Sequence, residues 1–223
     1  MLFRDRIHAG QLLAAQLSRY ANDPNVLVCA LPRGGVVVGF QVAETLNARF
    51  DVLIVRKLGV PGQNEVAMGA IASGGIRVLS QDLIDQLGIS DRLVEAVIAR
   101  EQRELARRET VYRGNAPAPT IQSRTVILVD DGIATGATMW AAAAAVRQQQ
   151  PERLVIAVPV APPSTCAELA TQADEVVCIA RPEPFYAIGA FYQDFHQVSD
   201  EEVRELLQRA ARRNVSRNAS AGA

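Results

Sequence analysis

Two adjacent carboxylates lead directly into a loop of small residues in the stretch VILVDDGIATGAT, residues Val126–Thr138. The loop would present backbone N–H groups at the start of a helix, where about half a positive charge suits a phosphate monoester. Thr135 and Thr138 add hydroxyl donors. Asp130 and Asp131 would repel a phosphate at close range, but carboxylates accept hydrogen bonds from neighbouring hydroxyls and tolerate Mg²⁺. The stretch therefore predicts a sugar-phosphate site, in which the loop binds the phosphate and the acids bind the sugar.

Other phosphate-binding loops fit this stretch less well. It lacks the lysine of a Walker A loop, and its glycines do not have the G-x-G-x-x-G spacing of a dinucleotide-binding loop. A single aspartate at the end of a strand could simply cap a helix. The adjacent pair, followed by T-G-A-T, favours a ligand site instead.

The same stretch resembles the phosphoribosyl-diphosphate (PRPP) signature of type I phosphoribosyltransferases, which has four apolar residues, two acids and a loop containing T-G-x-[ST]. The resemblance implies that Asp130 and Asp131 hold the ribose hydroxyls. It also implies that the 5′-phosphate lies in the loop formed by Gly132, Ile133, Ala134, Thr135, Gly136, Ala137 and Thr138. The chain as a whole is similar to a group of bacterial proteins predicted to be phosphoribosyltransferases.

A second set of residues could hold the pyrophosphate of PRPP, which carries more charge. PRGG follows a buried strand, where Arg33 offers planar donors and Gly34 and Gly35 let the backbone approach phosphate oxygens. This segment resembles the family's pyrophosphate loop. Arg56 and Lys57 end the next strand, and because side chains alternate along a strand we expect only one of them to face the site. The resemblance favours Lys57.

The resemblance implies that a nitrogen nucleophile displaces pyrophosphate from the ribose, with Arg33, Lys57, Asp130 and Asp131 as the catalytic residues. Mg²⁺ is the expected cofactor, held largely by ligand oxygens and water, and reaching Asp130 or Asp131 only through water. We expect no dedicated metal site, because the sequence has no His/Cys cluster at metal-ligand spacing. The expected partners are PRPP and a small nitrogenous substrate.

Alternating strand and helix patterns must position these residues. Short apolar runs predict buried parallel strands at 25–31, 50–57, 125–130, 153–161 and 174–180, with helical spacing between most of them. The expected fold class is α/β, a doubly wound and mostly parallel sheet flanked by helices, as in type I phosphoribosyltransferases, in a single domain over 1–223. Ligands of such sheets bind at the carboxyl ends of the strands. PRGG, RKLG and DDGIATGAT all lie there.

The segment 58–113 interrupts this pattern and has the position of the family's mobile catalytic loop. It has a hairpin signal around Ser73–Gly75 and ends in a long charged helix after a capping residue, Ser90. We expect a lid that excludes water from the site. Arginines of this helix could reach an anionic substrate, although salt bridges such as Glu104–Arg108 explain most of them. They are Arg100, Arg103, Arg107, Arg108 and Arg113.

The segment 182–198 has the position of the family's substrate-selecting hood. Its aromatic rings could stack on a flat base or pack on the core. The base-binding candidates are Phe185, Tyr186 and Asp194. Ala134 stands where hypoxanthine-guanine and xanthine enzymes of the family usually have an Asp, which argues against a 6-oxopurine acceptor and leaves the base open. Residues 214–223 are expected to form a disordered tail.

Bulk composition narrows the remaining classes. With 223 residues, 49% of them hydrophobic, and a net charge of -1, the chain suits a compact domain and lacks a large basic surface for nucleic acid. Cys29, Cys166 and Cys178 have no CxxC spacing, which favours free thiols. We see no signal peptide and no long apolar run, and expect a cytoplasmic protein that does not engage a membrane. A homodimer is common on this fold, but the sequence identifies no interface.

The sequence therefore predicts a phosphoribosyltransferase that uses Mg-PRPP, transfers the phosphoribosyl group to a nitrogenous base or related amine, and releases pyrophosphate. The alternative is a PRPP-binding regulatory protein without transferase turnover. Its one supporting feature is the basic C-terminal helix, which is short and interrupted by acids. Hydrolysis of a phosphoribosyl compound is a third, chemically related reading.

Overall fold

A five-stranded parallel sheet forms the centre of the molecule. The computed structural model describes residues 2–114 and 116–221, apart from the side chains of 64, 65 and 214–221. The strands are β1 (Val26–Ala30), β2 (Arg49–Val52), β6 (Thr125–Val129), β7 (Arg153–Val160) and β8 (Glu175–Ala180). Their order in the sheet is β2-β1-β6-β7-β8, and all four pairings are parallel. The doubly wound α/β fold class is thus confirmed.

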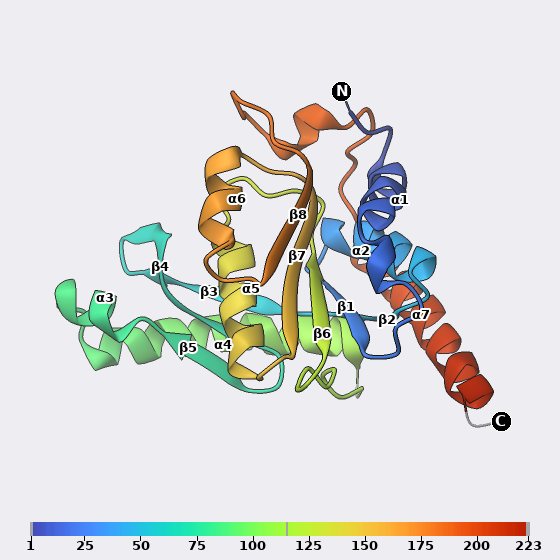
Figure 1. The fold of residues 1–223 in the computed structure, drawn as a ribbon. Helices are drawn as coiled ribbons and strands as arrows, with labels where there is room; N and C mark the ends of the chain where they lie inside the picture. The colour runs from blue at the N-terminus through green and yellow to red at the C-terminus, as the bar shows by residue number, and fades with distance from the viewer. Residues whose placement is uncertain (1, 115, 222–223) are drawn as a thin grey trace.

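Helices cover both faces of this sheet (Figure 1). Helices α1 (Arg6–Gln16) and α2 (Gly34–Thr45) lie on one face, and α5 (Ala137–Gln148) and α6 (Pro163–Leu169) lie on the other. A 3-10 turn (Ser18–Tyr20) follows α1, and α7 (Asp200–Ala221) packs against α2 and β2. Strands buried on both sides need continuous apolar sequence, and β1 and β6 are buried along their whole length.

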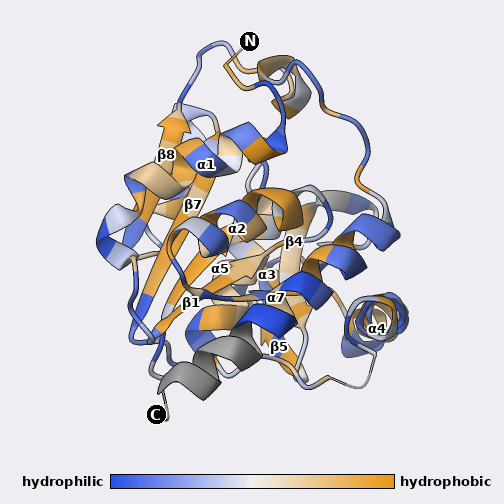
Figure 2. Ribbon diagram, turned by 90° about the vertical axis from the view of Figure 1, so that its right-hand side faces the viewer, coloured by the Kyte–Doolittle hydropathy of each residue, from blue (hydrophilic) through white to orange (hydrophobic). Residues whose placement is uncertain are grey.

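Hydropathy follows the layers. Figure 2 shows the central strands and α2 in the colours of hydrophobic residues, with hydrophilic residues prominent on α4 and α7. Cys29 and Cys166 are buried, Cys178 is half-buried, and all three are free thiols. None of the helices in the described part of the chain combines the length and the apolar character that a membrane span requires.

A second, antiparallel sheet forms the first part of the predicted insert. It contains β3 (Val55–Val60), β4 (Gln63–Ala72) and β5 (Ile76–Leu79), in the order β3-β4-β5. The predicted hairpin lies between β4 and β5, where Gly74 and Gly75 have φ angles of 83° and 77°. Helices α3 (Gln81–Gln86) and α4 (Asp91–Arg113) follow, and Ser90 is the N-cap of α4 as the sequence indicated. Whether this insert moves as a lid stays a prediction.

The single strand predicted over 50–57 is wrong. The chain pairs with β1 through β2, ends that strand at Val52, and joins the antiparallel sheet from Val55 onward. Leu53 donates to the carbonyl of Ala30, whereas the carbonyl of Ile54 accepts from Ser73, so the change of sheet occurs between them. Both halves are apolar, and hydrophobic pattern alone does not reveal a change of partner. The insert therefore begins three residues before the expected Leu58.

The hood and the N-terminal segment form one layer above the carboxyl ends of the strands, where both lie together in Figure 1. The hood contains a 3-10 turn (Ile188–Phe191). Backbone N–H groups of Leu2 and Phe3 donate to Phe191, and those of Gln193 and Asp194 donate to Phe3 and Arg4. Helix α7 then continues to Ala221, which differs from the disordered tail expected from residue 214. Residues 222–223, the end of that predicted tail, lie outside the described part.

Candidate functional site

The acidic pair lies at the carboxyl end of β6, directly beside the PRGG loop that follows β1. Helices α2 and α5, which follow these neighbouring strands, cover opposite faces, so a ligand crevice is expected between them. A Cβ atom on Gly34 would lie 1.8 Å from Asp131 Oδ2, and one on Gly35 would lie 2.8 Å from Asp130 Oδ1. From the sequence, we expected these glycines to let the backbone approach phosphate oxygens. In the structure they make room for the two carboxylates.

The two carboxylates have different surroundings. Asp131 is buried, and its Oδ2 accepts a hydrogen bond of 2.7 Å from Nε of Arg6, the first residue of α1. Asp130 is half-buried, and its Oδ1 accepts from the backbone N–H of Asp131 at 2.8 Å. Burial, and then the charge of Asp131, raise the pKa of the Asp130 carboxyl well above its usual range. Among the salt bridges of the described residues, Asp131 has an arginine partner and Asp130 has none.

The first part of the small-residue loop packs into the protein. A Cβ atom on Gly132 would lie 2.5 Å from the Ile188 side chain, so the hood rests directly on this position. The N–H of Ile133 donates to the carbonyl of Val160 at 2.9 Å, and the Ile133 side chain is buried. An N–H that is already paired within the protein is a poor donor for a ligand. Of the loop residues, only 134–138 therefore remain available to contact a phosphate.

The second part of the loop faces outward at the start of α5. Ala134, Thr135 and Thr138 are exposed, and Gly136 has a left-handed φ of 76° as the N-cap residue. The first N–H groups of a helix have no partner within the helix, so they point at whatever lies beyond its end. Thr165 of α6 supports the loop from behind by donating to the carbonyl of Ala134 at 2.9 Å. We define 134–138 as the phosphate loop.

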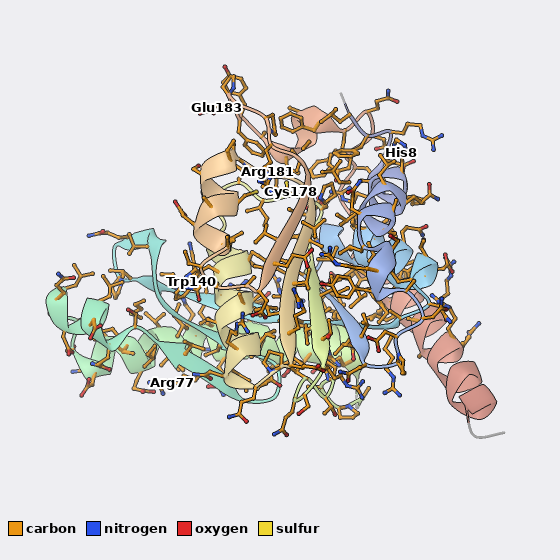
Figure 3. The ribbon with its side chains drawn as sticks, in the orientation of Figure 1. His8, Arg77, Trp140, Cys178, Arg181 and Glu183 are labelled. Atoms are coloured by element: carbon orange, nitrogen blue, oxygen red, sulfur yellow. The ribbon has the colours of Figure 1, made fainter. Side chains whose placement is uncertain are left out.

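Trp140 lies one helical turn beyond the phosphate loop, on the side of α5 that Figure 3 shows turned toward α6 and β4. Its backbone N–H donates to the carbonyl of Gly136 at 2.8 Å. A cavity of about 190 Å³ lies beside it, lined also by Thr135, Ala67 of β4 and Leu169 of α6. The indole therefore shares a small space with the phosphate loop.

A larger cavity of about 420 Å³ lies between β3, α4 and the carboxyl ends of β1 and β2, and we call it the cationic pocket. Its charged lining residues are Arg56, Lys57, Arg100, Glu101 and Arg108. Pro32 of the PRGG loop and Thr138 of the phosphate loop also line it. The predicted proximity of PRGG, RKLG and DDGIATGAT at one edge of the sheet is thus observed.

Arg56 and Lys57 both line the cationic pocket, although strand alternation suggested that only one would. The cavity follows consecutive residues 53–57, from the connection after β2 into β3, which is an edge strand, so residues of both faces contribute. Arg56 donates to Glu101 Oε2 through Nε at 2.9 Å and through a terminal nitrogen at 2.6 Å. Arg100 bonds the other oxygen of Glu101 at 3.0 Å. Two cations of this pocket, Arg56 and Arg100, thus pair with one buried carboxylate, Glu101.

The remaining arginines of α4 are held mostly by salt bridges. Arg107 and Arg108 each lie 2.8 Å from Glu104, and their hydrogen bonds lower the pKa of this carboxyl to about 2. The buried Arg113 pairs with Asp51 at 2.8 Å, which fastens the end of α4 to β2. With the bond of Arg100 to Glu101, salt bridges therefore account for four of the five arginines, although Arg100 and Arg108 also line the cationic pocket.

Arg33 does not lie in the lining of the cationic pocket as described. Its guanidinium lies 3.7 Å from Asp200 at the start of α7, and both side chains are half-exposed. The hydroxyl of Tyr112 donates to the same carboxylate at 2.6 Å. A contact of Arg33 with pyrophosphate therefore requires the side chain to turn from Asp200, and it remains a prediction.

The hood candidates differ in their freedom to bind a base. Phe185 packs against Phe191 with ring centroids 5.4 Å apart. Tyr186 is 85% exposed. The Asp194 carboxylate accepts a bond of 3.1 Å from the backbone N–H of His196 and is mostly exposed. The structure does not bring these residues into the cationic pocket, whose lining comes from β3, α4 and the strand ends.

The comparison with known families decides the class. A model of the phosphoribosyl transferase domain matches residues 4–195, which includes the PRGG loop, the acidic pair, the phosphate loop and most of the hood. The chain belongs to this family.

Similar proteins include two curated relatives and one solved structure, and each alignment covers nearly all of this chain. Two Mycobacterium tuberculosis proteins, provisionally named phosphoribosyl transferases, are 44% identical over 211 residues, or 95% of this chain. The chain spans 47% of the length of these curated relatives. The crystal structure of TT1426 from Thermus thermophilus is 43% identical, covers 93% of this chain and 98% of its own, and superposes with a TM-score of 0.82.

Sequence reasoning missed two residues of the candidate site. Arg6 reaches Asp131 from 125 positions away in the chain, and Glu101 reaches Arg56 from 45 positions away. Both are charged residues within amphipathic helices, where a solvated position is the usual expectation. The only signal available was that Arg6 follows a helix-capping aspartate, Asp5, which places it at a helix start near the ends of the strands.

Proposed function

We propose that this protein binds Mg-PRPP and transfers its phosphoribosyl group to a nitrogenous base or related amine, releasing pyrophosphate. One observation carries the proposal: a neutral phosphate loop, an acidic pair and a cationic pocket meet at one edge of the sheet. PRPP presents a 5′-phosphate, a ribose diol and a pyrophosphate. Each part of the ligand has a region of matching chemistry.

The reaction would break the bond between the ribose anomeric carbon and the pyrophosphate oxygen, which leaves with the electron pair. The nitrogen nucleophile forms the new bond and then loses its proton. Lys57, Arg56 and the α4 arginines would stabilise the charge that develops on the leaving group, because cations fixed in a partly enclosed site act more strongly than in water. The phosphate loop and acidic pair would hold the ribose in position for this displacement.

The residues present fit a divalent cation at the acidic pair. Asp130 is a carboxylate without an arginine partner among the described salt bridges. Burial, and then the charge of Asp131, raise its pKa, so added positive charge there would stabilise its ionised form. Within the described residues, no three His, Cys, Asp or Glu side chains gather as a dedicated metal site. Mg²⁺ would be held by ligand oxygens and water, with Asp130 reached through water, and would help to neutralise the pyrophosphate.

The acceptor would approach from the hood side of the ribose. Tyr186 has a free aromatic face there, and Ala134 leaves the loop without the carboxylate that 6-oxopurine enzymes of the family usually place at this position. Phe185 and Asp194 complete the set of candidates. The acceptor class stays open within nitrogenous bases and amines.

The decisive experiment measures pyrophosphate release from Mg-PRPP in the presence of a panel of purines, pyrimidines and other amines. Release with one acceptor supports transfer and identifies the substrate. Release without any acceptor indicates hydrolysis. Calorimetric binding of Mg-PRPP without release would favour the PRPP-binding regulator, and an absence of binding would refute the proposal. Asp130→Asn is the matched control, because loss of activity in that variant excludes a contaminating enzyme.

A further inference from the structure

Arg6 joins three parts of the molecule at the candidate ribose site. Its Nε donates to Asp131 Oδ2 at 2.7 Å, and one terminal nitrogen donates to the carbonyl of His196 at 2.7 Å. Its guanidinium carbon lies 3.9 Å from the centroid of the Phe195 ring. The residue is only 7% exposed. A buried arginine with three different partners restricts all of them to one arrangement.

The same carboxylate is also enclosed from the other sides. A Cβ atom on Gly34 of the PRGG loop would lie 1.8 Å from Asp131 Oδ2 and 2.9 Å from Arg6 Nε. The hydroxyl of Tyr192 in the hood donates to the Asp131 carbonyl at 2.6 Å. Among the described side-chain hydrogen bonds, none uses Asp131 Oδ1. Arg6 thus fixes one carboxylate oxygen and leaves the other for a ligand.

Arg6 belongs to the segment that fastens the hood. Phe3, three residues earlier, donates its N–H to the carbonyl of Phe191, and Gln193 donates to the carbonyl of Phe3. The N–H of Asp194 donates to the carbonyl of Arg4. The guanidinium bond to His196 continues this line of contacts to the end of the hood. A change at Asp131 can therefore reach the hood through a single side chain.

We propose that Arg6 is a positioning residue that couples the ribose-binding carboxylate Asp131 to the hood. Binding of the ribose would be favoured when the hood is fastened, and fastening of the hood would be favoured when the ribose is bound, because coupling between two sites is reciprocal. The inference rests on the proposed binding of Mg-PRPP. It adds a residue of the N-terminal helix that acts through Asp131 and through the hood.

Three variants separate charge from bridging. Arg6→Gln removes the charge, Arg6→Lys keeps it but lacks the planar set of donors that reaches two partners, and Arg4→Gln removes a neighbouring exposed arginine as a matched control. Calorimetry with Mg-PRPP measures ribose-site affinity. Hydrogen exchange at the amides of Phe3, Gln193 and Asp194 measures how firmly the hood is fastened, and thermal unfolding measures the fold.

Arg6→Gln should weaken Mg-PRPP binding by about 10- to 100-fold, as expected for loss of a charged hydrogen-bond partner, and should speed exchange at the three amides. Arg6→Lys should recover the charge beside Asp131 but not the bridge to the hood, so exchange should stay fast and the affinity should remain several-fold below that of the wild type in a protein of normal thermal stability, which a merely structural role would not produce. Arg4→Gln should match the wild type. Wild-type affinity and wild-type exchange in Arg6→Lys, or wild-type affinity in a folded Arg6→Gln, would overturn the inference.

A measurement on the wild-type protein keeps the inference testable if Arg6→Gln does not fold. Mg-PRPP should slow exchange at Gln193 and Asp194 in the unaltered chain, and unchanged exchange at saturating ligand would contradict the coupling. Failure of the wild type to bind Mg-PRPP would instead refute the proposed function, and the inference with it. If the wild type binds Mg-PRPP but the Arg6 variants change neither affinity nor amide exchange, the coupling through Arg6 is refuted and the proposed function is not.

Discussion

The phosphate loop and the cationic pocket, the two regions that we propose bind anions, have opposite designs. The phosphate loop consists of five consecutive residues at the start of α5, offers hydroxyl and backbone donors, and contains no charged side chain. The cationic pocket draws Arg56 and Lys57 from β3 and Arg100 and Arg108 from α4. Directional neutral donors suffice for a monoester, whereas a pyrophosphate leaving group carries enough charge to need cations. On the proposed function, the phosphate loop would serve binding alone, and the cationic pocket would also promote departure of the leaving group.

The largest expected effect lies between the two regions, at the acidic pair. Asp130→Asn with Asp131→Asn should reduce Mg-PRPP affinity by at least about 100-fold, because two charge-assisted hydrogen bonds to the ribose are lost. Calorimetry measures the change in affinity. Undiminished affinity would show that Asp130 and Asp131 do not bind the ribose.

The structure adds a control to this prediction, because Asp131 is also the partner of the buried Arg6. Breaking such a pair leaves an uncompensated charge and destabilises a fold by about 3–5 kcal/mol. Asp130→Asn alone is therefore the cleaner probe, and thermal unfolding should accompany both variants.

In the cationic pocket, Lys57→Ala should reduce turnover by about 100-fold, as expected for loss of one fixed group that stabilises a developing charge. Its effect on Mg-PRPP affinity should be smaller than its effect on turnover, since the charge on the pyrophosphate rises as the bond breaks. Steady-state pyrophosphate release measures turnover, and its dependence on the Mg-PRPP concentration separates this effect from the effect on affinity. If turnover with the correct acceptor does not change, Lys57 does not contact the leaving group.

In the phosphate loop, Thr135→Val should weaken Mg-PRPP binding by about 1–3 kcal/mol, the contribution of one hydrogen bond to a charged group. Turnover at saturating PRPP should change little, because the 5′-phosphate keeps its charge through the reaction. Thr135→Ser retains the hydroxyl and is the matched control. A Thr135→Val variant that loses turnover but keeps its affinity would contradict the proposal that the phosphate loop serves binding rather than the chemical step.

The smallest expected effect has the opposite sign. Glu101 binds Arg56 at 2.6 Å and is the one carboxylate in the lining of the cationic pocket as described. Glu101→Gln should free these donors and tighten binding of inorganic pyrophosphate by roughly 1 kcal/mol, about fivefold. Glu95→Gln, at an exposed pair with Arg77, is the control. Weaker pyrophosphate binding in a folded Glu101→Gln would show that the carboxylate supports the pocket rather than competing for it.

The phosphate loop could be predicted from sequence because its chemistry is local. The loop and the acidic pair that precedes it lie together within residues 130–138, and the strand and helix around them have clear periodic patterns. The α/β fold class follows from the same patterns. The cationic pocket could be predicted only in part, since Lys57 lies in a recognisable segment but Arg100 and Arg108 lie in a helix whose surface charges look ordinary.

Long-range pairing accounts for what the sequence did not reveal. The apolar run 50–57 contains no sign that Val52 and Val55 belong to different sheets, because both halves satisfy the same pattern. The pairing of Arg6 with Asp131 depends on how α1 lies against the strand ends, which no local spacing encodes. Gly34 and Gly35 were predicted to let the backbone approach phosphate, which stays a prediction; in the structure, these glycines make room for carboxylates that are distant in the chain.

The position of Trp140 gives the protein an optical property. It is the single tryptophan in the chain, and it shares a cavity of about 190 Å³ with Thr135 and Gly136. Indole emission responds to the polarity and water content around the ring, so an anion that settles in the phosphate loop would alter the light that the protein emits. Pyrophosphate confined to the cationic pocket would leave this emission nearly constant, because Trp140 is not part of the lining described for that cavity. Fluorescence can therefore report which of the two regions a ligand has entered, without any added label.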